Sequence, residues 1–71
     1  MTRNYKDFTI RVNAIVHPNY NEMGYKAEFF IPKTNGTKEH LSYYETYDKG
    51  IKPMMVVEKV QRIIDVLYYK H

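Results

Sequence analysis

Tyrosines are the side chains in this sequence that are best suited to binding another molecule. Tyr43, Tyr44 and Tyr47 lie within five positions of one another in HLSYYETYDKG, which spans residues 40–50. Tyrosine offers a large contact area for little loss of conformational entropy, and it is enriched among residues that dominate binding at interfaces. A group of tyrosines therefore indicates either a partner-binding surface or part of a small aromatic core. The element that positions the rings decides between the two.

Residues for covalent or metal chemistry are scarce. The chain has no cysteine, and its single serine, Ser42, lies two residues from His40 on the same side of an expected strand. Nothing specific supplies an orienting carboxylate or an oxyanion hole for this pair. His17, His40 and His71 lack metal-ligand spacing, and three glycines are too few for a phosphate-binding loop. We therefore expect a protein that is not an enzyme, with no catalytic residues, metal or cofactor.

Composition indicates one small domain spanning residues 1–71. The absence of cysteine fits the reducing cytoplasm, and no apolar stretch reaches the length of a membrane span or a signal peptide. The net charge of +3 is spread along the chain, without the basic cluster typical of DNA-binding proteins. Asn, Ile, Lys and Tyr have AT-rich codons and are abundant, which points to a low-GC bacterium or a bacteriophage as the source.

Alternating apolar residues predict strands over residues 8–17 and 25–32. The Asn35-Gly36 pair then indicates a hairpin turn into a third strand over residues 40–47. Pro53 suits the first turn of a helix expected over residues 54–69. The apolar stripe of that helix contains Val56, Val57, Val60, Ile63, Ile64 and Leu67.

The order of these elements predicts an α+β fold, a three-stranded antiparallel β-meander with one C-terminal α-helix packed on one face. One helix covers only one face of a sheet, so the other face is expected to stay open. Ile15 and Phe30 interrupt the polar side of their strands and should lie on that open face. An apolar aromatic patch on an uncovered face usually marks an interaction site.

The length of the hairpin loop decides which tyrosines join Phe30. A two-residue loop pairs Lys26 with Glu45 and places Tyr43 and Tyr47 on the open face. A three-residue loop with Gly36 in the left-handed conformation shifts the register by one residue. Leu41 and Tyr43 then enter the core and Tyr44 lies outside. Both registers remain open, and we favour the three-residue loop because it buries more apolar surface in a small core.

The loop PNYNEMG, residues 18–24, carries Tyr20 and Met23 among polar neighbours. These side chains either fold back over the edge of the core or form a recognition loop. The candidate partner-binding residues are Ile15, Phe30, Tyr43, Tyr44, Tyr47, Arg11, Lys26, Tyr20 and Met23.

These residues favour a protein-binding module that acts as a stoichiometric inhibitor or regulator, with a homodimer as one form it could take. The alternative is a protein that binds single-stranded nucleic acid, in which aromatic rings stack on bases while Arg11 and Lys26 contact the backbone. Glu28 and Glu45 near the same surface make this alternative the less favoured one.

The stretch GYKAEFFIP, followed by a third strand and a helix, resembles the HicB-type antitoxin domain, a small sheet-plus-helix module that binds a toxin. The resemblance covers residues 8–67 in the order of elements, and its specific match is Gly24-Tyr25 with the Ala-Glu-Phe that follows. The Pro-rich turn usual in that family is replaced here by residues 33–36. The resemblance implies a role in binding another protein.

Overall fold

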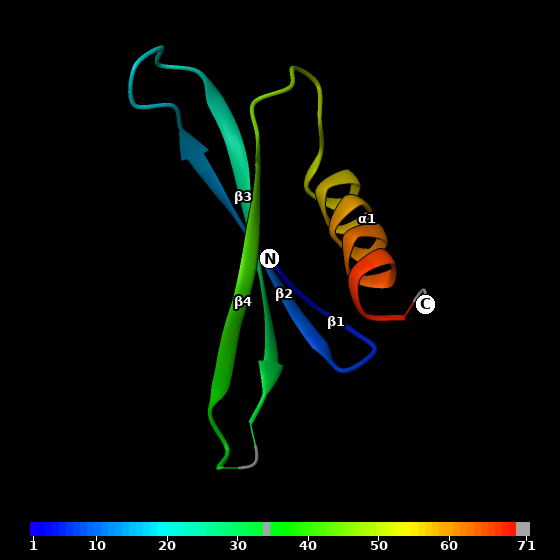
Figure 1. The fold of residues 1–71 in the computed structure, drawn as a ribbon. Helices are drawn as coiled ribbons and strands as arrows, with labels where there is room; N and C mark the ends of the chain where they lie inside the picture. The colour runs from blue at the N-terminus through cyan, green and yellow to red at the C-terminus, as the bar shows by residue number, and fades with distance from the viewer. Residues whose placement is uncertain (34, 70–71) are drawn as a thin grey trace.

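The computed structural model, which describes residues 1–33 and 35–69, contains a four-stranded antiparallel sheet followed by one helix (Figure 1). The predicted α+β class is confirmed, but the expectation of three strands is wrong. Strands β1 to β4 lie in the sheet in the order of the sequence. Their bounds are β1 Thr2–Tyr5, β2 Phe8–Val16, β3 Met23–Pro32 and β4 Lys38–Thr46, and α1 is Pro53–Ile64.

The additional strand, β1, is short and has no alternating apolar pattern, since Tyr5 is its only residue that packs on the core. It pairs with β2 from Thr2 opposite Arg11 to Tyr5 opposite Phe8. The turn between them contains Lys6 with a φ of 52°. Lysine is uncommon in this left-handed region, so the sequence carries none of the usual hairpin signals here.

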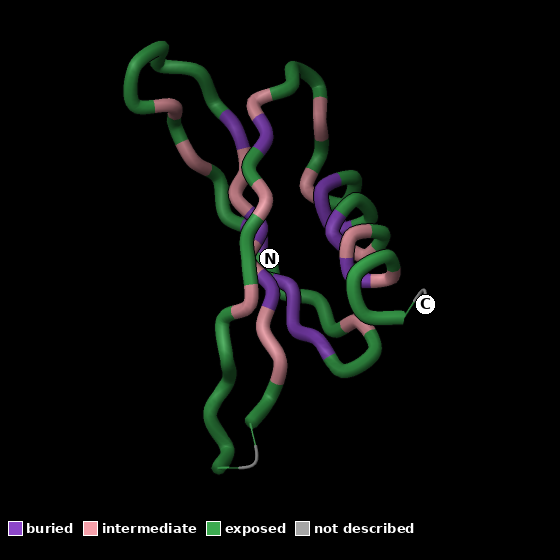
Figure 2. The backbone as a smooth tube through the Cα atoms, in the orientation of Figure 1, coloured by how far each residue is buried: buried purple, intermediate pink, exposed green. Residues whose placement is uncertain are grey.

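The core lies between α1 and one face of the sheet. Figure 2 shows buried segments on the facing sides of the strands and the helix. α1 packs over the central strands β2 and β3. Burial of these apolar side chains is the main term that stabilises a domain of this size. The buried set is Phe8, Ile10, Val12, Ala27, Phe29, Val56, Val57, Val60 and Ile64.

The regular helix is shorter than predicted. α1 ends at Ile64, and residues 65–69 continue as one wider turn of π-helix. Leu67, expected on the buried stripe, is 54% exposed because the wider turn breaks the 3.6-residue period that would place it over the sheet. In the part of the chain that the structure describes, no helix has the length and apolar character needed to span a membrane.

Next to the turn, the β3–β4 hairpin follows the three-residue register. The N–H of Lys33 donates to the carbonyl of Thr37 at 2.7 Å, and Gly36 has a φ of 83°. Pairs near the turn, such as Phe30 with His40, keep this register. The register expected next to the turn is therefore confirmed, while Thr34, the first residue of the expected loop, lies outside the described residues.

A β-bulge between Phe29 and Phe30 then changes the register by one residue. Beyond it, Phe29 lies opposite Ser42 and Lys26 opposite Glu45, as the two-residue loop would have required. Each of the two alternatives thus describes one half of the hairpin. The extra residue on β4 is Leu41, which lies between the partners of Phe29 and Phe30.

The bulge settles the position of the tyrosines. Leu41 and Tyr44 are partly buried against the core, whereas Tyr43 pairs with Glu28 and is 56% exposed. The favoured register had placed Tyr43 in the core and Tyr44 outside, and this expectation is wrong for both rings. It is correct for Leu41, because that residue precedes the change of register.

Asp65 connects the end of α1 to the first hairpin. The Tyr5 hydroxyl donates to the Asp65 carboxylate, with distances of 2.8 and 2.7 Å to its two oxygens, and Lys6 Nζ lies 2.6 Å from Oδ1. The hydrogen bond to Asp65 raises the pKa of Tyr5 above its ordinary value. The hydrogen bond to the same carboxylate also raises the pKa of Lys6.

We expect Asp65→Asn to lower the thermal unfolding midpoint near neutral pH. Both pKa values are raised by folding, so this stabilisation is complete below the ordinary values of 10.0 for Tyr5 and 10.5 for Lys6. It is lost as the pH rises through the higher folded values. The difference in midpoint between the wild type and Asp65→Asn should therefore shrink as the pH rises above these ordinary values, which calorimetry at several pH values can measure.

The matched control is Asp48→Asn, which removes an exposed carboxylate from the β4–α1 connection. It should leave the alkaline profile of the wild type unchanged. A constant difference between Asp65→Asn and the wild type across the alkaline range would contradict the assigned coupling.

Candidate protein-binding face

The sheet face opposite α1 is not covered by any element in the described part of the chain (Figure 1). We call it the open face. It is formed by alternate residues of the three longer strands, whose pairing brings them into rows across the sheet. Its residues are Thr9, Arg11, Asn13 and Ile15 on β2, Lys26, Glu28 and Phe30 on β3, and Lys38, His40, Tyr43 and Glu45 on β4.

One cluster on the open face is built around Phe30. The guanidinium carbon of Arg11 lies 5.1 Å from the centre of the Phe30 ring, and the His40 ring meets Phe30 edge-on at 5.2 Å. Glu28 Oε2 lies 3.0 Å from His40 Nε2. A cation over an aromatic face at an exposed site contributes about 0.5–1 kcal/mol. These contacts favour the observed arrangement of the ring and the charges.

A second cluster lies beside it, around Tyr43. Lys26 Nζ lies 4.8 Å from the centre of the Tyr43 ring, and Lys26 also pairs across the strands with Glu45. Tyr43 is more than half exposed although Lys26 lies over it. The open face therefore alternates aromatic rings with both signs of charge.

Tyr47 extends this surface beyond the end of β4. Its ring lies against Gly24, where a Cβ would overlap both the Thr46 carbonyl oxygen and the Tyr47 ring. The ring centre of His17 is 4.9 Å from that of Tyr47 and 4.7 Å from that of Tyr20. Burial raises the pKa of Tyr47, and the charge of nearby Glu45 adds to the shift. Gly24 thus makes room for an aromatic row that reaches the β2–β3 loop.

Most candidate residues lie on or beside the open face, and two do not. Tyr20 joins it through the contact with His17, and its side chain is 71% exposed rather than folded over the core. Tyr44 lies on the helix side, where Lys59 Nζ is 5.9 Å from its ring centre. Met23 also leaves the open face, because it follows the same side of β3 as Tyr25. The candidates that share the open face or extend it are Ile15, Phe30, Tyr43, Tyr47, Arg11, Lys26 and Tyr20.

Glu28 was expected near the open face and lies on it, whereas His40 was not among the candidate residues and lies there as well. His40 was expected on the same side of the strand as Ser42, but the bulge places these two residues on opposite faces. The three-residue register by itself makes His40 the partner of Phe30, and the bulge moves only Ser42 to the helix side. The contact between Glu28 and His40 has no signal in the sequence.

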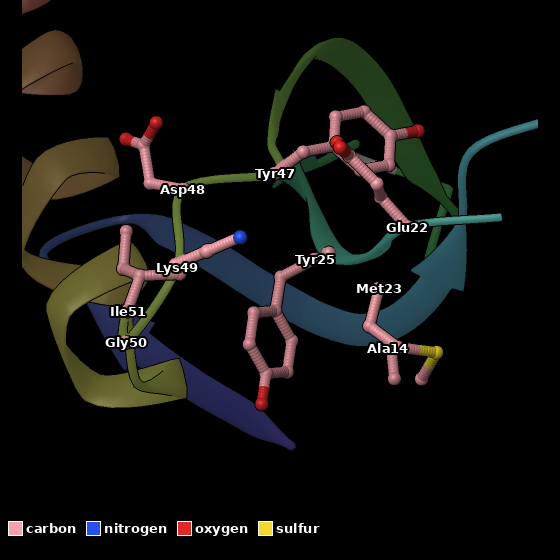
Figure 3. Close-up of a pocket in the computed structure, with 10 residues that line it drawn as sticks. Ala14, Glu22, Met23, Tyr25, Tyr47, Asp48, Lys49, Gly50 and Ile51 are labelled. Atoms are coloured by element: carbon pink, nitrogen blue, oxygen red, sulfur yellow. The ribbon is translucent and has the colours of Figure 1, made fainter. Parts of the chain in front are cut away.

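A cavity of about 360 Å³ lies on the helix side, at the ends of β2 and β3 that α1 does not cover (Figure 3). Tyr25 and Met23 line it from β3, while Asp48, Lys49 and Ile51 line it from the β4–α1 connection. Among the residues described, no three His, Asp or Glu side chains are grouped so that they could hold a metal ion.

Comparison with known proteins finds no family model that matches this chain, no similar curated protein and no similar solved structure.

Proposed function

We propose that this chain is a small protein-binding module that acts without catalysis, as a stoichiometric inhibitor or regulator, by placing its open face on a partner. The observation that carries the proposal is the row of Phe30, Tyr43 and Tyr47 on the open face, whose rings contact neighbouring charged groups. Side chains that are ordered before binding lose less entropy when a partner docks. Tyrosine and arginine are also enriched among the residues that dominate interface energy.

The open face carries charges of both signs. This mixture favours a protein as the partner over a uniformly charged molecule such as a nucleic acid. Arg11 and Lys26 lie over rings, while Glu28 and Glu45 lie in the same rows. A partner surface with apolar residues at its centre and charges of both signs around them would complement this pattern.

We expect Phe30→Asp to abolish stoichiometric binding to the partner, because it replaces one ring of the aromatic row with a carboxylate. The test is affinity capture from cells of the native host, followed by light scattering of the purified complex. The wild type should form a complex of fixed stoichiometry that Phe30→Asp fails to form.

Met55→Asp is the matched control, because Met55 is 47% exposed on α1, away from the open face. It should bind as the wild type does, and circular dichroism should show both variants folded. Retention of the same partner by folded Phe30→Asp would overturn the proposal.

Single-stranded nucleic acid is the second candidate partner, because the rings of Phe30 and Tyr43 on an uncovered sheet could stack on bases. Fluorescence anisotropy with mixed RNA and DNA oligomers at low salt tests this candidate. Binding that weakens steeply with salt and requires Phe30 would favour it, and an absence of binding at low salt would remove it.

A further inference from the structure

We propose that β4 pairs edge to edge with β4 of a second copy of this chain, so that two sheets join into one antiparallel sheet across a two-fold axis. The axis lies between Leu41 and Ser42 of each copy. This self-association is separate from the proposed use of the open face, and the two can fail independently.

The outer edge of β4 is available for this pairing. β4 is the last strand in the sheet, and its backbone pairs only with β3 within the described chain. Figure 1 shows the sheet from this side, with no element crossing in front of β4. α1 makes most of its contacts with the sheet on β2 and β3. An exposed strand edge of this length is a template for another strand.

The bulge makes a second copy a better partner than an ordinary strand. Leu41 is an extra residue, so a regular strand would lose its match to β4 at that point. An identical bulge running in the opposite direction carries the same extra residue and restores the match. Leu41 of one copy then lies opposite Ser42 of the other, and both residues point to the helix side, as direct partners must.

The same register pairs opposite charges. Counting outward from the axis, His40 meets Tyr43 of the second copy, and Lys38 meets Glu45. All four residues are on the open face in this structure, so the faces agree along the whole strand. A shift of one residue would instead bring Glu39 opposite Glu45 and pair residues from opposite faces. Charge and geometry therefore select one register.

Pairing in this register would also enlarge the open face. The two-fold axis stands perpendicular to the joined sheet, so both open faces lie on the same side and both helices on the other. Tyr43 of each copy would then lie next to His40 of the other copy and extend the Phe30 cluster across the junction. A dimer would present a surface twice as wide without covering the aromatic row.

Charge reversal tests the pairing. Lys38→Glu alone gives two Glu–Glu pairs in the dimer, and Glu45→Lys alone gives two Lys–Lys pairs. Each variant should weaken self-association by about tenfold or more, because like charges directly opposite one another are destabilising. An equimolar mixture of the two variants restores both opposite-charge pairs and should dimerise as the wild type does. Sedimentation equilibrium over a range of concentrations measures each dissociation constant.

Recovery in the mixture also shows that both single variants are folded. Lys33→Glu carries the same change of charge outside β4 and should dimerise normally. A wild type that stays monomeric at millimolar concentration would overturn the inference, and so would a mixture no better associated than its components. Loss of partner binding by Phe30→Asp in a protein that still dimerises would separate the two proposals.

Disulfide trapping tests the register. The chain has no cysteine, so His40→Cys and Tyr43→Cys can be made as single variants and mixed. These positions should lie directly opposite one another, within the Cα separation that a disulfide requires. The mixture should form a heterodisulfide rapidly under mild oxidation. His40→Cys mixed with Glu45→Cys is the control, and faster trapping in this control would overturn the proposed register.

Discussion

Phe29→Ala is expected to lower the free energy of unfolding by about 3–5 kcal/mol. Phe29 is 1% exposed, packs edge-on against Phe8 with ring centres 6.4 Å apart, and lies at the centre of the core under α1. A domain of this length has a total stability of roughly 4–10 kcal/mol. The variant should therefore be largely or wholly unfolded at moderate urea concentrations, as followed by circular dichroism.

Phe30→Ala is the matched control, because it removes the same ring from the next residue on the opposite face. Phe30 is only partly buried and contacts Arg11 and His40. Its loss should cost about 1 kcal/mol or less. Similar losses at the two positions would contradict the assignment of one face to the core and the other to the open face.

Gly24→Ala has the second largest expected effect, a loss of about 1–3 kcal/mol. A Cβ at this position overlaps the carbonyl oxygen of Thr46, which is backbone and cannot move without disturbing the β3–β4 pairing. It also overlaps the ring of Tyr47, which must leave its place against β3. Urea denaturation measures the loss, and the NMR shifts of His17 report the displaced ring.

Gly50→Ala separates steric overlap from backbone strain. Gly50 has a φ of 77°, and a Cβ there would meet nothing within 4 Å. Alanine should therefore cost about 1–2 kcal/mol through the left-handed conformation alone. The His17 shifts should remain those of the wild type. If they moved equally in both variants, the displacement of Tyr47 could not be attributed to Gly24.

Periodicity in the sequence was sufficient to predict β2, β3 and most of α1. Each of these elements has one apolar side that packs on the core, so apolar residues recur at regular intervals in its sequence. β1 has no such periodicity, because a single tyrosine, Tyr5, provides its contact with the core. The turn that follows it also lacks a sequence signal, because it depends on Lys6 in a left-handed conformation. The end of α1 was misplaced because apolar residues such as Leu67 continue past the regular helix.

The open face was predictable where it interrupts the pattern of a strand. Ile15 and Phe30 are apolar residues at positions that should be polar, and the structure places both opposite α1. Tyr43 and Tyr44 could not be assigned, because one extra residue in β4 exchanges the two faces. The turn at Gly36 sets one register, and the pairs beyond Leu41 follow the other. The extra residue joins the two registers, and it concerns pairing between strands rather than a pattern along the sequence.

The division of the core between the sheet and α1 has a consequence for synthesis of the chain. Val56, Val57, Val60 and Ile64 supply nearly half of the buried apolar core residues, and all of them follow the four strands. A ribosome releases the strands first, so Ile10, Val12 and Phe29 have no cover until α1 emerges. The nascent sheet therefore exposes its apolar core face to the cell, in addition to the aromatic open face, until α1 closes the first of them.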